Sequence, residues 1–187
     1  MKKVLAVVLA FIVLIAIWGI GTRNSLISMS EEVKLQESQV QTQLQRRSDL
    51  IPNFVATVKG YATHEENVYT AIAEARTKLN GAIKSNDVDA INEANSELDS
   101  ALSRLLVVVE NYPELKASQN FIALQDELAG TENRISIARE KYNSTVASYN
   151  KEIKKFPKNI IANMCGLTEA KYFEASEKAQ EVPTVNF

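Results

Sequence analysis

The chain of 187 residues contains one histidine and one cysteine, which removes most sites that metal and thiol chemistry need. His64 opens the sequence His-Glu-Glu-Asn-Val, and Val68 stands where a zinc-binding His-Glu-x-x-His helix needs its second histidine. A di-iron site in a helical bundle needs two Glu-x-x-His motifs, which one histidine cannot supply. Cys165 has no second cysteine to pair with and no basic cluster around it beyond Lys158 and Lys171. We therefore expect no catalytic residue, no metal, no cofactor and no enzymatic activity.

Glycine and proline are also scarce, at six and four residues. No Gly-x-x-x-x-Gly-Lys or Gly-x-Gly-x-x-Gly loop is present, so the usual phosphate-binding turns are excluded. Alanine, glutamate, lysine, leucine, glutamine and serine dominate instead, a composition typical of helices. The net charge of −2 creates no general attraction for nucleic acid, which we do not expect as a partner.

Charge is missing altogether from Val4–Ile20, a run of apolar residues near the N-terminus. At about 1.5 Å per residue this run makes a helix of roughly 26 Å, which is at the short end of what crosses a bilayer. Lys2 and Lys3 precede it, and cytoplasmic flanks are enriched in basic residues. The sequence predicts a single-pass membrane protein whose N-terminus is cytoplasmic and whose remaining domain is extracytoplasmic.

Two other interpretations of the apolar run stay open. It could be a cleaved signal peptide, although Gly19-Ile20-Gly21 is a poor cleavage site and no cysteine nearby permits a lipoprotein. It could also be the core helix of the folded domain. We favour an uncleaved signal-anchor that uses the lipid bilayer as its partner. The corresponding domain division is 1–22 for the anchor, 23–180 for a helical bundle and 181–187 for a flexible tail.

The rest of the chain shows the apolar spacing of long amphipathic helices. The clearest segment has residues that alternate four and three apart, which keeps one face on a seam between helices. They are Ile91, Asn95, Leu98, Leu102, Leu105, Val109 and Tyr112, all apolar except Asn95. Candidate N-caps at Ser85-Asn86-Asp87 precede that segment, and Pro113 follows it. Short connections favour an all-α, up-and-down four-helix bundle with long helices. The helices are expected at about 25–47, 52–79, 91–112 and 118–156, with a shorter terminal helix at about Leu167 to Ala179.

The start of the second helix is ambiguous. Ser48–Ile51 has the character of a break, because Arg46-Arg47 suits a helix C-terminus and Asp49 is a candidate cap, so we place the break before Pro52. In the alternative, the membrane helix continues through Pro52 and turns at Gly60. Thr63 to Glu66 would then form a capping box for the following helix.

Polar residues beside the apolar stripes form the only candidate site. Glu65 falls in the apolar phase of its segment, and Glu132-Asn133-Arg134 flank the seam of the last long helix. A buried carboxylate needs a partner, so these residues form either a structural network or an interaction patch. The basic pair Arg46-Arg47 is similarly either a solvated helix end or part of that patch.

Two functions fit these features. The first is a non-enzymatic, membrane-anchored scaffold or adaptor that engages another membrane protein or a second copy of itself. The alternative is a sensory or small-ligand-binding module whose bundle core holds a small molecule. That core site would be lined by Tyr61, Tyr142 and Tyr149, whose hydroxyls need partners when buried.

Several blocks of sequence closely resemble the LemA family. The first covers Gln43–Val55, Val58–Ala62 and His64-Glu65, and the second covers Glu110–Ala117, Leu124–Leu128, Gly130–Ile135 and Ala138-Arg139. Tyr142-Asn143, Tyr149-Asn150 and Phe156-Pro157 complete the match. The resemblance implies a bacterial cell-membrane protein whose soluble part is a four-helix up-and-down bundle. It implies no activity, because the family has no agreed biochemical function or active-site residues. Lys34-Leu35-Gln36 departs from the family, which more often shows Ala-Trp nearby.

Overall fold

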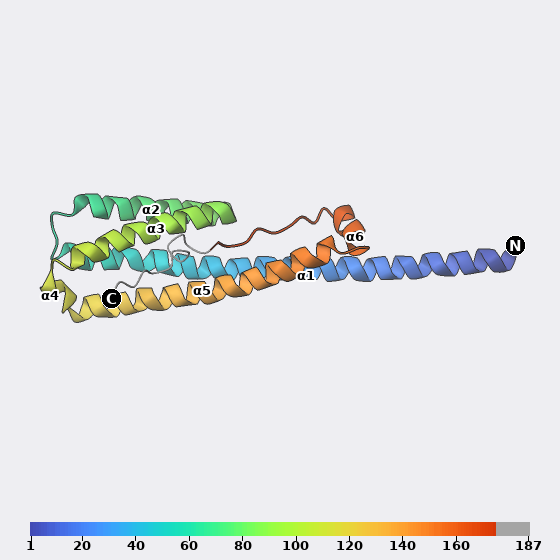
Figure 1. Cartoon of the computed structure of the whole chain (residues 1–187), viewed down its shortest axis with the longest axis horizontal. Helices are drawn as coiled ribbons and strands as arrows, with labels where there is room; N and C mark the ends of the chain where they lie inside the picture. Colours follow the sequence, from blue (N-terminus) through green and yellow to red (C-terminus); the bar gives the residue numbers. More distant parts are fainter. Residues whose placement is uncertain (175–187) are drawn as a thin grey trace, which may run out of the picture. The chain divides into compact units, whose positions relative to one another are not determined.

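The computed structural model describes residues 1–174, and all the regular secondary structure in that range is helical (Figure 1). The expectation of an all-α chain is confirmed. The tail expected at 181–187 lies outside the described residues. The helices are α1 (Lys2–Lys59), α2 (Glu66–Ser85), α3 (Val88–Val109), α4 (Pro113–Lys116), α5 (Gln119–Lys154) and α6 (Lys158–Met164).

The break placed before Pro52 is wrong, because α1 is a single helix of 58 residues that passes through this proline. Proline removes one backbone donor from a helix and crowds the preceding turn. The buried side chains around it compensate, since Ile51, Phe54 and Val58 are each at most 1% exposed. The alternative boundary, a turn at Gly60, is the one that the structure adopts. Packing of one face therefore outweighs the local signal of the proline.

The helix starts show one failed cap and one confirmed cap. The expected capping box from Thr63 to Glu66 is wrong, because α2 has Glu65 at its N-cap with no side-chain cap hydrogen bond. At the next start Asp87 is the N-cap of α3, as the sequence indicated. Its carboxylate accepts hydrogen bonds from the backbone N–H groups of Asp89 and Ala90, at 3.1 and 3.5 Å.

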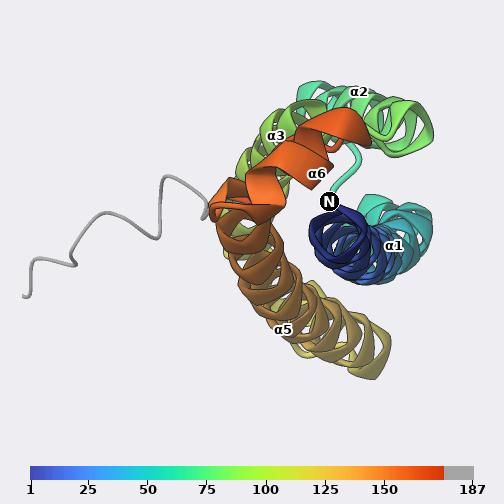
Figure 2. The same ribbon diagram turned by 90° about the vertical axis from the view of Figure 1, so that its right-hand side faces the viewer.

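The chain divides into two compact units. The first contains Met1–Ser38 and Lys141–Lys171, and the second contains Gln39–Glu140 and, among the described residues, 172–174. In the second unit α2 and α3 lie side by side in both ribbon views (Figures 1 and 2). The seam predicted along α3 is buried from Ile91 to Val109.

Within the second unit, residues 39–59 of α1 contact three other helices. The contacts to α2 and α3 are hydrogen bonds, and the contact to α5 is between two aromatic rings. They are Ser48 Oγ to Asn80 of α2 at 2.8 Å, Arg47 to Asn95 of α3 at 3.2 Å, and the Phe54 ring stacked on Phe121 of α5 with centroids 5.3 Å apart. This segment of α1 is therefore the common neighbour of the other helices in the unit.

In the first unit, the residues after α6 are not helical, so the terminal helix expected from Leu167 is wrong as far as residue 174. The rest of that expected helix lies outside the described residues. Polar side chains of α5 bind the backbone groups that a helix would have used. Tyr149 and Tyr142 donate to the carbonyls of Thr168 and Lys171 at 3.0 and 2.8 Å, and Asn150 exchanges two hydrogen bonds with Ala170, both at 2.9 Å. The segment stays extended because α5 satisfies its backbone.

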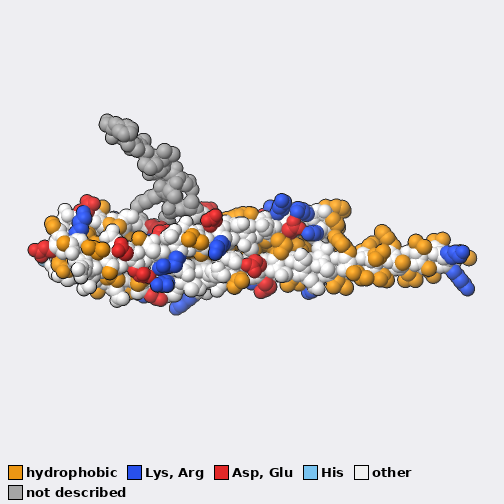
Figure 3. Space-filling view, turned by 90° about the horizontal axis from the view of Figure 1, so that it is seen from below, with side chains coloured by type: hydrophobic (Ala, Val, Ile, Leu, Met, Phe, Trp, Pro, Cys, Tyr) orange, Lys and Arg blue, Asp and Glu red, His pale blue; other side chains and the backbone are white. Residues whose placement is uncertain are grey.

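The apolar stretch at the start of α1 is exposed, and none of its most apolar window is buried. The interpretation as a core helix is therefore wrong. Figure 3 shows apolar side chains along this part of the helix and basic side chains at its end. By length and composition it is a helix that could cross a membrane.

Tyr142 gives a prediction for the first unit. Burial, with a smaller contribution from nearby Glu37, raises the pKa of Tyr142 to about 12. The folded chain therefore holds this proton more tightly than the unfolded chain, so its contribution to stability is complete below pH 10. That contribution is lost as the pH rises toward 12. We expect Tyr142→Phe to cost about 1 kcal/mol at pH 7, because the Lys171 carbonyl loses its donor.

The measurement is thermal unfolding of the detergent-solubilised chain between pH 7 and 11.5. The variant should lose less stability over the alkaline range than the wild type. Tyr69 and Tyr149 also have raised pKa values through burial, so the alkaline loss should be reduced rather than abolished. Identical alkaline slopes for the two proteins would contradict the assignment.

Candidate functional site

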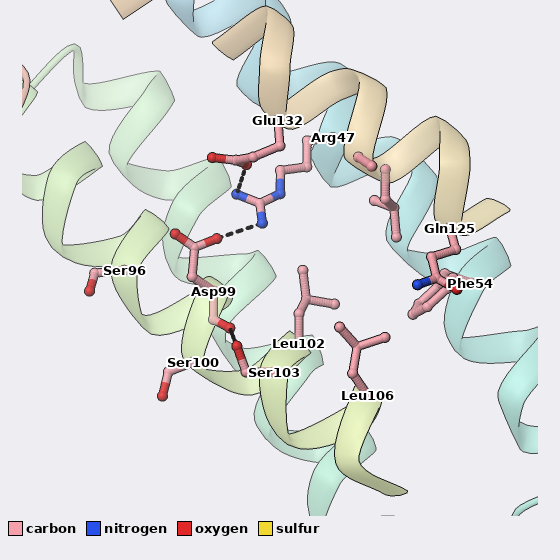
Figure 4. Close-up of a pocket in the computed structure, with 12 residues that line it drawn as sticks. Arg47, Phe54, Ser96, Asp99, Ser100, Leu102, Ser103, Leu106, Gln125 and Glu132 are labelled. Carbon is pink, nitrogen blue, oxygen red and sulfur yellow. Dashed lines mark hydrogen bonds and ion pairs between the residues drawn. The ribbon is translucent and has the colours of Figure 1, made fainter. Parts of the chain in front are cut away.

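Arg47 is the centre of the polar residues in the second unit. Its side chain extends from α1 and is only 8% exposed, yet it carries a full positive charge. It donates to the carboxylates of Asp99 on α3 and Glu132 on α5, at 2.5 and 2.9 Å (Figure 4). A third hydrogen bond reaches the Asn95 side-chain oxygen at 3.2 Å. A buried guanidinium with three acceptors is well compensated for the loss of water.

The partners of Arg47 on α3 hold each other in position. Asn95 and Asp99 are four residues apart, so they share one face of the helix. The Asn95 amide donates to the second oxygen of Asp99 at 3.0 Å. Both oxygens of the Asp99 carboxylate therefore accept hydrogen bonds. Asn95, the polar residue within the apolar seam of α3, has partners for its side-chain oxygen and its amide.

A second, more exposed group of ion pairs lies beside the first. Arg46 of α1 and Arg134 of α5 donate to the same oxygen of Glu127, at 2.7 and 3.1 Å. Their side chains are 56% and 40% exposed, so these pairs contribute little to stability. We call the two groups together the arginine cluster, which consists of Arg46, Arg47, Asn95, Asp99, Glu127, Glu132 and Arg134.

Four of the six predicted patch residues meet in this cluster, namely Arg46, Arg47, Glu132 and Arg134. Asn133 is exposed on α5, in sequence between two cluster members. Glu65 is the N-cap of α2 and belongs to neither group of ion pairs. Asp99 and Glu127 were missed. The signal for Asp99 was Asn95, a polar residue in an apolar seam with a carboxylate one turn later.

A pocket of about 520 Å³ lies next to the buried part of the cluster. Arg47, Asp99 and Glu132 line its polar end, as Figure 4 shows. The other lining residues come from α1, α3 and α5, and they are Phe54, Ser96, Ser100, Leu102, Ser103, Leu106, Gln125, Leu128 and Ala129. Its volume falls within the range of sites that bind small molecules or peptide side chains.

The three tyrosines of the ligand-binding hypothesis do not line this pocket. Tyr61 is 44% exposed and lies in the turn after α1. Tyr142 and Tyr149 are buried, but their hydroxyls bind the extended segment after α6. The site that this hypothesis placed among them is therefore not formed as expected.

The two neighbouring arginines provide a matched test of the cluster. Arg47→Met leaves two carboxylates and Asn95 without their cation, and we expect a loss of about 3 kcal/mol in the free energy of unfolding. This lies at the lower end of the usual range because Asp99 and Glu132 are 24% and 49% exposed and can regain water. Arg46→Met removes an exposed pair and should cost less than about 1 kcal/mol. Denaturant unfolding of both variants measures the difference, and equal losses would disprove the central role of Arg47.

Comparison with known proteins places the chain in a family. The sequence model of the LemA family matches residues 36–187, which include every residue of the arginine cluster and the pocket. The chain is 28% identical to the magnetosome protein MamQ 2 of Paramagnetospirillum magneticum, over 87% of this chain and 68% of that protein. It is 24% identical to the magnetosome protein MamQ of Magnetospirillum gryphiswaldense over the same shares.

The chain is also 29% identical to the protein LemA of Metamycoplasma hominis, over 91% of this chain and 78% of that protein. None of these names is the name of an enzyme. The exposed apolar helix and these relatives indicate a membrane-associated protein. The resemblance seen in the sequence is confirmed over most of its length, and the chain belongs to the LemA family.

Proposed function

We propose that the protein is a non-enzymatic, membrane-anchored scaffold or adaptor of the LemA type. The observation that carries this proposal is the composition of α1. One continuous helix bears an exposed apolar stretch long enough for a bilayer at one end, and the arginines of the polar cluster further along. The same helix would thus fasten the chain to the membrane and organise the domain that meets a partner.

The proposed architecture is an anchor at 1–22 followed by an up-and-down four-helix bundle at 23–180. Contacts of α1 with α2, α3 and α5 within the second unit support the bundle. The lysines before the apolar stretch support a cytoplasmic N-terminus in the bacterial cell membrane and an extracytoplasmic bundle.

The proposed contact surface is the exposed side of the arginine cluster, formed by Arg46, Glu132 and Arg134 together with Asn133. Glu65 is the sixth residue of the predicted patch. Alternating charges on a helix face favour a specific charged partner, because like charges opposite one another are costly. The partner is another membrane protein or a second copy of this chain.

The anchor is tested by fractionation. The full chain should remain in the membrane pellet after alkaline carbonate extraction, because transfer of its apolar side chains to water is unfavourable. Val8→Asp together with Leu14→Asp should release it, whereas Glu31→Asp, a control outside the apolar stretch, should not. Recovery of the intact wild-type chain in the soluble fraction would disprove the anchor.

The contact surface is tested by photo-crosslinking in cells. A photoreactive residue at Asn133 should capture a discrete partner or a second copy. Glu132→Gln together with Arg134→Gln should reduce capture several-fold, because two of the three charges of the surface are then removed. Thr77, exposed on α2, provides the control position. Equal capture from both positions, or no capture from Asn133, would contradict the proposal.

Small-ligand binding is the second candidate function, and the pocket of about 520 Å³ is the observation that favours it. A small molecule would need the pocket to be vacant in the full chain. Maleimide labelling of Ser100→Cys in a Cys165→Ala background measures whether the pocket is accessible, and a thiol at this position that does not react in the folded chain would count against ligand binding.

A further inference from the structure

In the first unit, the apolar stretch of α1 gives way to packed helix within a few residues. Thr22 is the first buried residue of α1, and Leu26 follows one turn later. Trp18 and Arg23, both exposed, lie on either side of this change. Tryptophan and basic residues are enriched where a membrane-spanning helix leaves the hydrocarbon core. For the anchor proposed above, the boundary of the bilayer therefore lies between Trp18 and Arg23.

The short helix α6 lies beside α1 at this boundary. A side-chain carbon placed on Gly19 would be 3.9 Å from the Cδ1 atom of Ile161, which is an ordinary van der Waals distance. Ala162, the next residue of α6, is buried. In Figure 1 the apolar stretch of α1 continues past α6 toward the N-terminus. Figure 2, seen from the N-terminal side, shows α6 in front of the end of α5. The first unit therefore presents α6 toward the side on which the anchor leaves it.

Apolar side chains of α6 that do not pack on α1 are exposed. Ile160 and Met164 are four residues apart on α6, so they share one face of it, and they are 50% and 79% exposed. Phe156, in the turn before α6, is 81% exposed. We call these three residues the α6 face. A single exposed apolar residue needs no explanation, but a group of them beside an exposed apolar helix indicates a binding surface.

Basic side chains accompany the α6 face. Between residues 151 and 169 there are four lysines and two carboxylates, namely Lys151, Lys154, Lys155, Lys158, Glu152 and Glu169. Glu152 pairs with Lys155 and Lys158, and Glu169 pairs with Lys154 at 2.7 Å. The lysines outnumber the carboxylates, so this region attracts anions. Figure 3 shows basic and apolar side chains close together over the end of α5 and over α6. Exposed apolar residues flanked by lysines match the chemistry of the headgroup layer of an anionic membrane.

We propose that the α6 face is a second membrane contact, which lies in the headgroup layer of the bilayer that α1 crosses. Its apolar side chains would enter the boundary between headgroups and acyl chains, and the nearby lysines would face anionic phospholipids. The α6 face is continuous with the apolar stretch through the contact of Ile161 with Gly19, which is why lipid rather than another protein is its occupant. This inference rests on the proposed anchor, but it does not depend on the adaptor role.

Quenching by spin-labelled lipids tests the proposal on the full chain. In a Cys165→Ala background, an environment-sensitive fluorophore is attached to Met164→Cys, and the chain is reconstituted into vesicles of phosphatidylcholine and phosphatidylglycerol. Lipids with the nitroxide near the headgroup should quench this label about threefold more than a label on Thr77→Cys, which is exposed on α2. Omission of phosphatidylglycerol should weaken quenching at position 164 about twofold, because the lysines lose their anionic partners. Equal quenching in neutral vesicles would overturn the assignment to anionic headgroups.

A label on Leu14→Cys, within the apolar stretch, separates this proposal from the anchor. Lipids with the nitroxide deep in the acyl chain should quench it. Quenching at position 14 without any at position 164 above the level of position 77 would overturn the α6 contact and leave the anchor intact. No quenching at position 14 would overturn the anchor and the α6 contact together. Blue-shifted emission at position 164 without lipid quenching would show that a second copy covers the α6 face, which also overturns the lipid contact.

Substitutions within the α6 face provide a second measurement. Phe156→Ser together with Met164→Ser should reduce the quenching of a label on Ile160→Cys about threefold. Val107→Ser, which removes an exposed apolar side chain from α3, should leave that quenching unchanged. Thermal unfolding of both variants should match that of the wild type, because the substituted residues are exposed. Unchanged quenching in the double variant would overturn the α6 face as the contact.

Discussion

The second unit depends on the need of one buried guanidinium for acceptors. Arg47 cannot lose its charge, and it has little access to water, so its place on α1 must coincide with Asp99 of α3 and Glu132 of α5. Apolar seams that repeat every three or four residues can shift by a heptad and still bury leucine against leucine. The Arg47 contacts do not repeat. They therefore specify the register that the apolar side chains leave free.

The same requirement explains the first unit on a smaller scale. The extended segment after α6 exposes backbone groups that neither a helix nor a sheet satisfies, and Tyr142, Tyr149 and Asn150 of α5 satisfy them. Tyr142 and Tyr149 lie on the heptad seam of α5, where their rings pack and their hydroxyls reach the segment, and Asn150 is the residue after Tyr149. Helix-forming composition in Leu167 to Glu174 is overruled because α5 offers the backbone better partners than solvent.

Sequence patterns predicted helices where periodicity was strong and failed where a single local signal stood alone. The predictions of the α3 seam and of its Asp87 cap are correct, because the apolar spacing and the capping residue indicate the same start of the helix. Pro52 was taken for a break, but the buried face of Ile51, Phe54 and Val58 carries the helix through it. Phe156 continues the heptad spacing of the last long helix, yet it is 81% exposed because α5 ends at Lys154.

The candidate site could be predicted only in part from the sequence, for a related reason. Polar residues beside a seam can be found in one helix, but their partners depend on how helices align, which periodicity does not determine. Asp99 and Glu127 are unremarkable charges in the sequence and acquire their roles only when α1, α3 and α5 meet. The family match begins at residue 36 and covers all of these positions, while the apolar stretch lies outside it. A bilayer requires only apolar length from an anchor, whereas the charge of Arg47 requires particular side chains at fixed positions on two other helices.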